Sequence, residues 1–488
     1  MVYQTEAEVE NIVTKIPEQQ TDESAFLKTY EKVFTAFLVL ITVFHMVCAA
    51  LACVINMETI KRIEPNIPYV LAAGLLFYII ISAVRYPWNL KRIRAFISRM
   101  FTYEQIYFII LWIWFIISIQ VNHNVYNKNY YSNNRWNLYD LFFNALILLP
   151  LAKLLCREKA KKIIERVLFI VLIAYSGFTF YILPQMFQLN RVVMPSGYAF
   201  YVQEKPMAFR WGMHYNLTAS YSFVMLVLCL CFMTNHNKII KIISIFLFPI
   251  HLFACHLTNS RTIFYTGIVI FALFLFLCVW NRHSEKNTCF RIIAALTAVG
   301  IGILFYVISR QASFLLFENI SHVNEIVYNT DASITERIRP ANTNIGARRR
   351  YWKVTLTRIF NDRTSFFFGV TPSKAPYTTE SGFRVDHAHN IVLQIGLCYG
   401  FPAMIGFVIF LFLICMKTVR LLYYCIKDPS CFLFIKPVII IISLLIPGLV
   451  EIHIVRYGIE RCVFMLISGW ILELSEQKAI VSAQQKAD

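Results

Sequence analysis

The sequence predicts an all-α integral membrane protein of about twelve transmembrane helices, with one large loop on the outer side of the membrane. Two observations lead to this prediction. First, 58% of the 488 residues are apolar and only 15% are charged, whereas a soluble domain is about a quarter charged. Second, the apolar residues recur in stretches of about 17 to 25, the length of a helix that crosses about 30 Å of hydrocarbon. These observations exclude a water-soluble fold.

The predicted spans follow one another along the chain, and all are expected to be helices because no water satisfies the backbone inside a bilayer. Residues 1–30 are polar and acidic, lack the pattern of a signal peptide, and are expected to form a cytoplasmic tail, as are residues 476–488. Spans 1–9 fall within 31–309 and spans 10–12 within 390–475. Their expected ranges are 33–56, 67–85, 104–121, 137–156, 167–187, 215–234, 239–258, 263–280, 292–309, 390–416, 437–451 and 456–474.

Lysine and arginine concentrate in alternate loops between these spans. The basic loops are 85–99, 153–166, 235–241, 281–291 and 417–436. Because loops rich in Lys and Arg stay in the cytoplasm, this alternation predicts that both termini are cytoplasmic. The net charge of +18 therefore reflects membrane topology, and no nucleic-acid partner is predicted.

The segment 310–389 is the predicted large loop between spans 9 and 10. It is too long for a simple connector, and loops of such length are usually functional or disordered. Within it, GARRRYWKVTLTRIF (346–360) has helical spacing that places Arg348, Trp352, Thr355 and Ile359 on one face. This pattern predicts a helix that lies at the membrane surface.

Arginines collect at the predicted outer boundary, where the topology rule would deplete them. They are Arg210, Arg261, Arg348, Arg349, Arg350, Arg384, Arg456 and Arg461. The planar guanidinium binds phosphate or carboxylate through two hydrogen bonds, so a cluster of arginines predicts an anionic ligand. Each arginine taken alone can instead extend to a lipid phosphate. Glu451 and Arg456 share the turn of the last hairpin, where they either pair with each other or line the same cavity.

Two histidines and an aspartate stand just before span 10, in the order Asp386, His387 and His389. A near-neutral imidazole can take a proton from a hydroxyl group, so His389 is a candidate general base. A metal site is the alternative, but a His-x-His pair with one nearby carboxylate is a weak signal for one. No CxxC or other Cys/His ligand spacing is found, and neither a metal nor a cofactor is predicted.

Several short motifs in this half of the chain are similar to those of a known family. His389-Asn390 is followed after nine residues by Gly400 and then by Ala403, where the family pattern has Gly, Thr or Trp. The further matching residues are Ser260-Arg261, Gly346 with Arg348 and Trp352, Phe368-Gly369, and Arg210 with Gly212 and Asn216. In these residues the chain resembles the bacterial O-antigen ligase and Wzy-type polymerase family, over about 200–475.

The resemblance implies a GT-C-like, metal-independent and inverting glycosyltransferase. Such an enzyme takes a polyprenyl-diphosphate-linked glycan donor at the outer face of the bacterial cytoplasmic membrane and makes surface polysaccharide. The implied catalytic residues are His389 as the base, with Arg261 and Arg348 on the departing diphosphate. The expected substrate-binding residues are Arg210, Arg349, Asn390, His387, Glu451 and Arg456, of which Arg210, His387 and Asn390 belong to the motifs of the resemblance.

Alternatives remain open at this stage. A flippase for lipid-linked oligosaccharides, or another polytopic transporter, would also have about twelve spans, but transporters usually show internal repeats and charged sites near the bilayer midplane. Within the family, the acceptor can be a growing glycan, lipid A core or a protein hydroxyl. The sequence favours the enzyme over the transporter and does not select the acceptor.

Overall fold

The structure, a computed structural model, describes a large part of the chain. The described residues are 30–40, 43–44, 73–74, 77, 80–81, 83, 88–125, 158–188, 191–193, 199–203, 208–211, 215–258, 260–320, 345–372, 375, 377–378, 384–385, 387–428, 434–449 and 459–487. The predicted span 137–156 and nearly all of 67–85 lie outside these residues, as does the part of 33–56 beyond residue 44.

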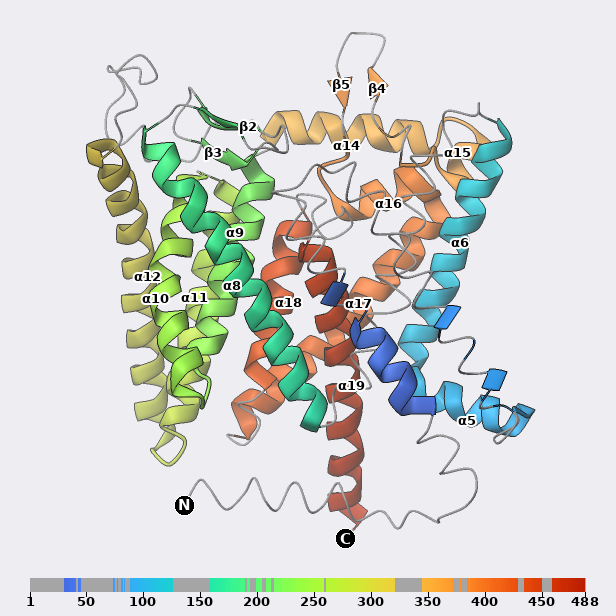
Figure 1. The fold of residues 1–488 in the computed structure, drawn as a ribbon, viewed down its shortest axis with the longest axis horizontal. Helices are drawn as coiled ribbons and strands as arrows, with labels where there is room; N and C mark the ends of the chain where they lie inside the picture. Colours follow the sequence, from blue (N-terminus) through green and yellow to red (C-terminus); the bar gives the residue numbers. More distant parts are fainter. Residues whose placement is uncertain are drawn as a thin grey trace.

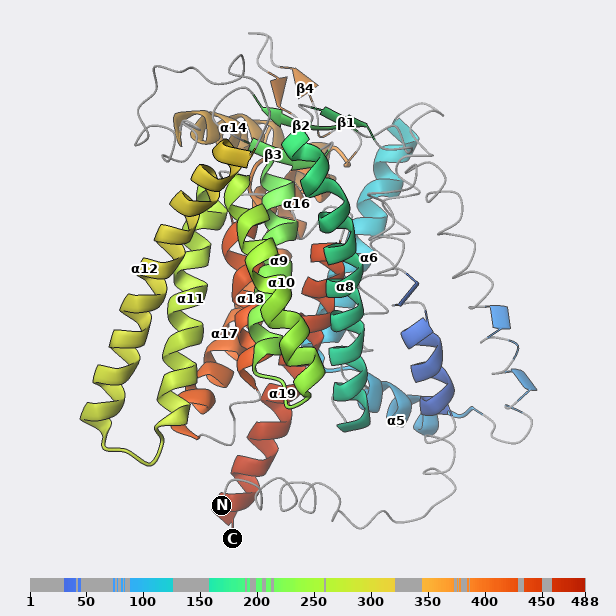
Figure 2. The same ribbon diagram turned by 60° about the vertical axis from the view of Figure 1, so that its left-hand side comes forward.

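The described chain is mainly a bundle of long helices that run side by side between two ends (Figures 1 and 2). They are α6 (Tyr103–Val125), α8 (Glu158–Gln188), α9 (Tyr215–Met233), α10 (Lys238–Leu257), α11 (Arg261–Arg282), α12 (Thr288–Ile320), α17 (Phe401–Lys427), α18 (Ile435–Gly448) and α19 (Ile459–Ala487). Among the described residues, five helices are long and apolar enough to cross a membrane. They lie within α6, α10, α11, α12 and α17, and α9 and α18 contain shorter apolar helices. The predicted multi-span membrane fold is thereby confirmed in its coarse form.

Short elements cover one end of the bundle, which is uppermost in Figure 1 and is called the α14 end below. Here α14 (Ile345–Ile359) lies across the long helices, close to α15 (Arg363–Phe368) and α16 (Ile391–Tyr399). An antiparallel sheet is formed by β1 (Arg191–Val193), β2 (Ala199–Gln203) and β3 (Ala208–Trp211), and a smaller one by β4 (Tyr377–Thr378) and β5 (Arg384–Val385). These strands are exceptions to the predicted all-α fold.

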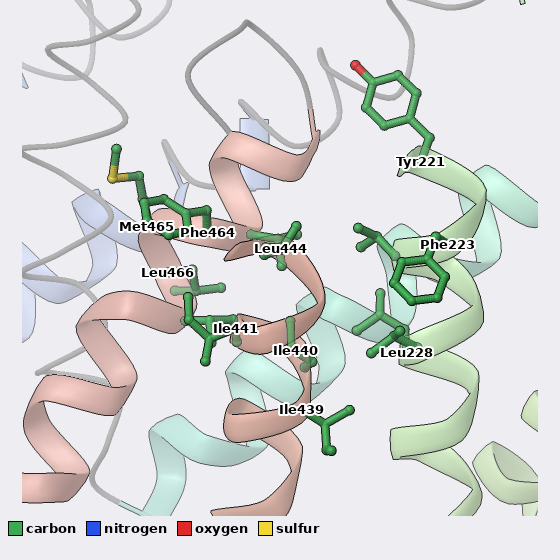
Figure 3. Close-up of a cluster of buried hydrophobic side chains, with 14 of the residues drawn as sticks. Tyr221, Phe223, Leu228, Ile439, Ile440, Ile441, Leu444, Phe464, Met465 and Leu466 are labelled. Atoms are coloured by element: carbon green, nitrogen blue, oxygen red, sulfur yellow. The ribbon is translucent and has the colours of Figure 1, made fainter. Parts of the chain in front are cut away.

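A central part of the buried core lies where α9, α18 and α19 meet (Figure 3). Every side chain from Ala219 to Phe232 of α9 is buried, as are most residues of α18 and the described side chains from Arg461 to Ser475 of α19. A helix that is apolar on all sides can only be stable when surrounded by other helices or lipid. The central position of α9, in contact with α8, α10 and α18, follows from this composition.

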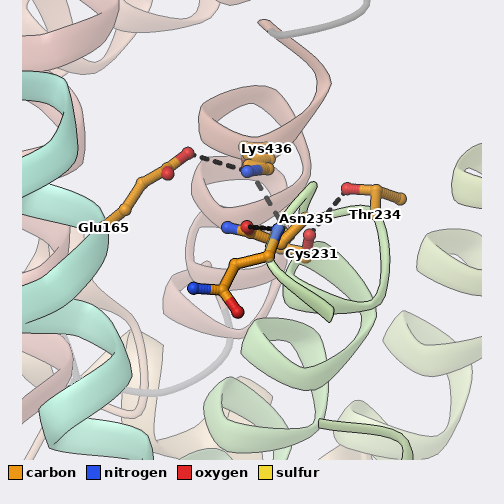
Figure 4. Close-up of polar contacts among 6 residues, drawn as sticks. Glu165, Cys231, Thr234, Asn235 and Lys436 are labelled. Atoms are coloured by element: carbon orange, nitrogen blue, oxygen red, sulfur yellow. Dashed lines mark hydrogen bonds and ion pairs between the residues drawn. The ribbon is translucent and has the colours of Figure 1, made fainter. Parts of the chain in front are cut away.

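Ion pairs join helices in the half of the bundle that is opposite the α14 end. Lys436 Nζ at the start of α18 lies 2.7 Å from Glu165 Oε1 of α8 (Figure 4), and Lys417 Nζ of α17 lies 3.0 Å from Glu104 Oε1 of α6. The short helix α5 (Leu90–Met100), which is capped by Asn89, lies at the same end (Figure 1). This end therefore carries basic residues that are held partly by acidic partners on neighbouring helices.

Two predicted boundaries differ from the structure. The range 390–416 is not one helix, because Gly400 has a φ of +93° and separates α16 from α17. The helix predicted to end at residue 309 continues as α12 to Ile320, so the first eleven residues assigned to the large loop are helical. Apolar residues continue in Phe314, Leu315 and Leu316, and no proline or glycine interrupts them.

Candidate functional site

His389 lies at the α14 end, immediately before α16, and residues of α14 contact it. The ring centroids of His389 and Tyr351 are 4.9 Å apart, and the indole Nε1 of Trp352 donates a hydrogen bond to the His389 carbonyl oxygen at 3.4 Å. The rings of His387 and His389 are 4.0 Å apart. The imidazole of His389 is half-buried, a position from which it can exchange a proton with a bound hydroxyl group.

The inward face of α14, which contacts the His389 segment, also carries an arginine, Arg348. Thr355 and Ile359 are buried and Arg348 is half-buried, whereas Arg349, Arg350 and Lys353 are exposed. The face predicted from helical spacing is therefore the buried face. Arg348 lies one turn before Trp352, so the helix presents a guanidinium on the side that contacts the His389 segment.

Asn390 fixes the start of α16 in two ways. Its side-chain oxygen accepts a hydrogen bond from the Leu393 backbone N–H at 3.0 Å, which is the usual N-cap interaction. Its Nδ2 donates to the carbonyl oxygen of Leu449 at the end of α18, at 2.7 Å. The residue thus joins the His389 segment to α18 and orients α16 at the same time.

Two glycines in the family-like motifs allow backbone to lie against backbone. A Cβ on Gly400 would overlap the carbonyl group of Phe367 and lie 2.7 Å from the Phe368 nitrogen, and a Cβ on Gly369 would overlap the backbone of Cys398 and Tyr399. The backbone N–H groups of Val370 and Thr371 donate to the carbonyls of Leu397 and Cys398 at 2.8 and 3.0 Å. Glycine is needed at both places because only it fits such contact at positive φ.

The helix α6 completes this packing from the side. The indole of Trp114 and the hydroxyl of Ser118 both donate to the Tyr399 carbonyl, at 3.3 and 3.1 Å, and Asn122 Nδ2 donates to the Phe368 carbonyl at 3.2 Å. The α15–α16 junction is thus tied to a long helix from the N-terminal half of the chain.

Two other predicted arginines, Arg261 and Arg210, lie at the α14 end on separate elements. Arg261 is the first residue of α11 and is half-buried, next to the buried N-cap Ser260. Arg210 lies in β3, opposite Tyr201 of β2. Both views place β3 beside one end of α14 (Figures 1 and 2). Glu451 and Arg456 lie outside the described residues, so their predicted roles stay predictions.

Sequence reasoning missed several residues of this region. Tyr351 and Gln394 contact the His389 segment directly, but neither belongs to a pattern that the sequence displays. Arg310, expected in the loop, is buried in α12, with its guanidinium carbon 4.4 Å from the centre of the Phe264 ring. Among the described residues, no group of three or more His, Cys, Asp or Glu side chains is placed to hold a metal ion.

The fold and the region around His389 define a class: a multi-span membrane protein with a histidine and arginines at one end of its helix bundle. Residues 245–408, about a third of the chain, match the model of a family described as O-antigen ligase. The match supports an O-antigen ligase/Wzy family for this chain and an O-antigen ligase or polymerase type of membrane function in surface polysaccharide biosynthesis. The comparison with curated proteins finds no match.

Proposed function

We propose that this protein is a membrane glycosyltransferase that transfers or polymerises glycan from a polyprenyl-diphosphate-linked donor onto a hydroxyl acceptor. One observation carries the proposal. His389 is held against α14 by the Tyr351 ring and the Trp352 hydrogen bond, and the same face of α14 carries Arg348. This arrangement lies within the segment that matches the O-antigen ligase family.

The chemistry assigns separate tasks to the histidine and the arginines. His389 takes the proton of the acceptor hydroxyl as its oxygen attacks the anomeric carbon of the donor, and the bond from that carbon to the diphosphate oxygen breaks. Arg261 and Arg348 stabilise the negative charge that develops on the departing diphosphate. Their guanidinium groups are already oriented in a water-poor site, so no solvent has to reorganise as the charge develops. Attack from the face opposite the diphosphate inverts the anomeric carbon.

The remaining predicted residues are proposed to bind substrate. Arg210 and Arg349 contribute positive charge near the diphosphate, and His387 and Asn390 border the acceptor beside His389. Glu451 and Arg456 follow α18, whose last turn is already joined to Asn390 through Leu449. The acceptor is a growing glycan, lipid A core or a protein hydroxyl, and the reaction uses neither metal nor cofactor.

We also propose the topology predicted from sequence, with about twelve spans, both termini in the cytoplasm and the α14 end facing outward from the bacterial cytoplasmic membrane. The loop between α9 and α10, the loop between α11 and α12 and the helix α5 all lie at the end opposite α14 (Figure 1). The basic residues Lys238, Lys241, Arg282 and Arg291 flank these two loops, as a cytoplasmic assignment for that end requires. In this topology the cytoplasmic tails are 1–30 and 476–488, and the outer loop leads up to His389.

The proposal is tested by assaying glycan transfer from a polyprenyl-diphosphate donor with purified His389→Ala and Arg348→Ala variants. General-base removal is expected to lower the rate by roughly 10² to 10⁴-fold. Lys353→Ala is the matched control for Arg348→Ala, since it removes a cation from the exposed face of the same helix. Wild-type transfer by both site variants at normal expression would overturn the assignment, and donor movement across liposomes without its consumption would favour the transporter.

A further inference from the structure

The backbone at His389 adopts a conformation that the surrounding structure must impose. Its φ is +49°, in the left-handed region that residues other than glycine seldom occupy. Such a conformation costs about 1–3 kcal/mol and persists only where neighbouring contacts fix it. The direction in which the imidazole points therefore depends on the groups that hold residues 388–390.

The Gln394 side chain makes a buried hydrogen bond to this segment. Its Oε1 accepts from the Ala388 backbone N–H at 2.9 Å, and its Nε2 donates to Cys398 Sγ at 3.2 Å. The side chain is only 9% exposed, and Ala388 is fully buried. By comparison, the hydrogen bond from the Trp352 indole to the carbonyl oxygen of His389 is longer, at 3.4 Å. The Gln394 side chain thus extends from the first turn of α16 and fixes the backbone of Ala388, which lies between His387 and His389.

We infer that Gln394 is a positioning residue, which acts through the backbone of Ala388 to aim His389 at the acceptor hydroxyl. This inference rests on the proposed function, because it assigns Gln394 a role only if His389 is the base. Losing the acceptor atom frees Ala388, and the left-handed backbone at His389 relaxes toward ordinary φ values. A displacement of about 1 Å at a reacting group lowers a rate by on the order of 100-fold.

The test compares two substitutions that remove the same kind of hydrogen bond. Gln394→Met keeps the side-chain length and removes the acceptor. Gln105→Met is the matched control, because Gln105 Oε1 also accepts a buried backbone N–H at 2.9 Å, from Thr102 at the start of α6. Both variants are expected to lose similar thermal stability. Only Q394M is expected to lower kcat, by roughly 10 to 100-fold, with the KM for the donor within about twofold of wild type.

Two further variants separate positioning from general damage. Gln394→Glu keeps an oxygen that can accept the Ala388 N–H, and it should recover most of the kcat that Q394M loses. In a His389→Ala background, Q394M should cause no further loss of the residual rate, since the two changes act on one group. Should Q394M fail to accumulate, Gln394→Asn replaces it, because it keeps the amide but shortens its reach.

The outcomes are distinguishable. If His389→Ala retains full transfer, the proposed function fails and the positioning role fails with it. If His389→Ala lowers transfer as expected while Q394M and Q105M have equal kcat values, the proposed function stands and only the role of Gln394 is overturned. A further loss from Q394M in the His389→Ala background would likewise contradict positioning through His389.

Discussion

Replacing Gly400 with alanine is expected to disrupt the junction between α15, α16 and α17. An alanine Cβ would overlap the Phe367 carbonyl group. In proteins, Cβ atoms essentially never lie within 3.0 Å of a heavy atom from another part of the chain. The obstacle is backbone, which cannot rotate away as a side chain would. The two chain segments must therefore separate by roughly 1 Å to regain van der Waals contact.

The free-energy cost has two parts. The backbone at Gly400, with φ +93° and ψ 168°, lies in a region that is nearly restricted to glycine, and strain there costs about 1–3 kcal/mol. Overpacking against the Phe367 carbonyl costs about 1–3 kcal/mol more. The sum, about 4 kcal/mol, is a large part of the roughly 5–15 kcal/mol that stabilises a typical domain. Because α16, which follows His389 directly, ends at this junction, transfer should fall as well.

The assay is thermal unfolding of the purified protein in detergent, together with glycan transfer at a temperature where the variant is folded. Gly177→Ala is the matched control, because no atom beyond its chain neighbours and the local backbone of α8 lies within 4 Å of the position that its Cβ would occupy. Alanine there should leave stability unchanged or raise it by about 0.5–1 kcal/mol. If Gly400→Ala unfolds at the wild-type temperature and retains wild-type transfer, the account of this junction is wrong.

Three further predictions concern other parts of the molecule. Lys436→Met should lower the free energy of unfolding by about 2 kcal/mol, since it removes the ion-pair partner of the largely buried Glu165. A double-mutant cycle with Glu165→Gln, followed by thermal unfolding, checks that the two side chains are coupled. The hydrogen bonds from the Ser365 backbone N–H and hydroxyl hold the pKa of Asp362 below its usual value, so this carboxylate stabilises the α15 end at neutral pH and loses that effect as the pH falls through its lowered pKa. Asp362→Ala should therefore be less stable than wild type by about 1 kcal/mol at pH 7, and unfolding curves should converge in acid. Exhaustive chelation should leave glycan transfer unchanged, and loss of transfer that added divalent metal restores would contradict the metal-independent mechanism.

Much of the fold could be predicted because it follows from local composition. The predicted ranges 104–121, 215–234, 239–258 and 263–280 coincide within a few residues with α6, α9, α10 and α11. Each of these stretches is apolar over the length of a bilayer and is bounded by polar residues, which is enough to predict a helix. The surface helix α14 was predicted for a similar reason, since alternation of its buried and exposed residues follows the helical repeat.

The site could be predicted only in part. His389 and Arg348 stand out in the sequence because ionisable groups beside apolar spans are rare. The contact of His389 with the aromatic residues of α14 could not be predicted, because Tyr351 and His389 are separated by 37 intervening residues and meet only after α14 folds over α16. The same holds for Gln394, whose role depends on how the backbone turns at His389.

By itself the sequence determined that this is a membrane protein of many helical spans, where one surface helix lies, and that His389 and several arginines are candidates for chemistry. These conclusions depend on hydrophobicity, helical periodicity and residue type, which are local properties of the chain. The tertiary structure alone decided that Gly400 divides the predicted span 390–416, that Gly369 and Gly400 let two backbones meet, and that Gln394 holds the His389 segment. Those features arise from contacts between segments that are distant in sequence or from a single backbone turn, and hydrophobic pattern carries no information about either.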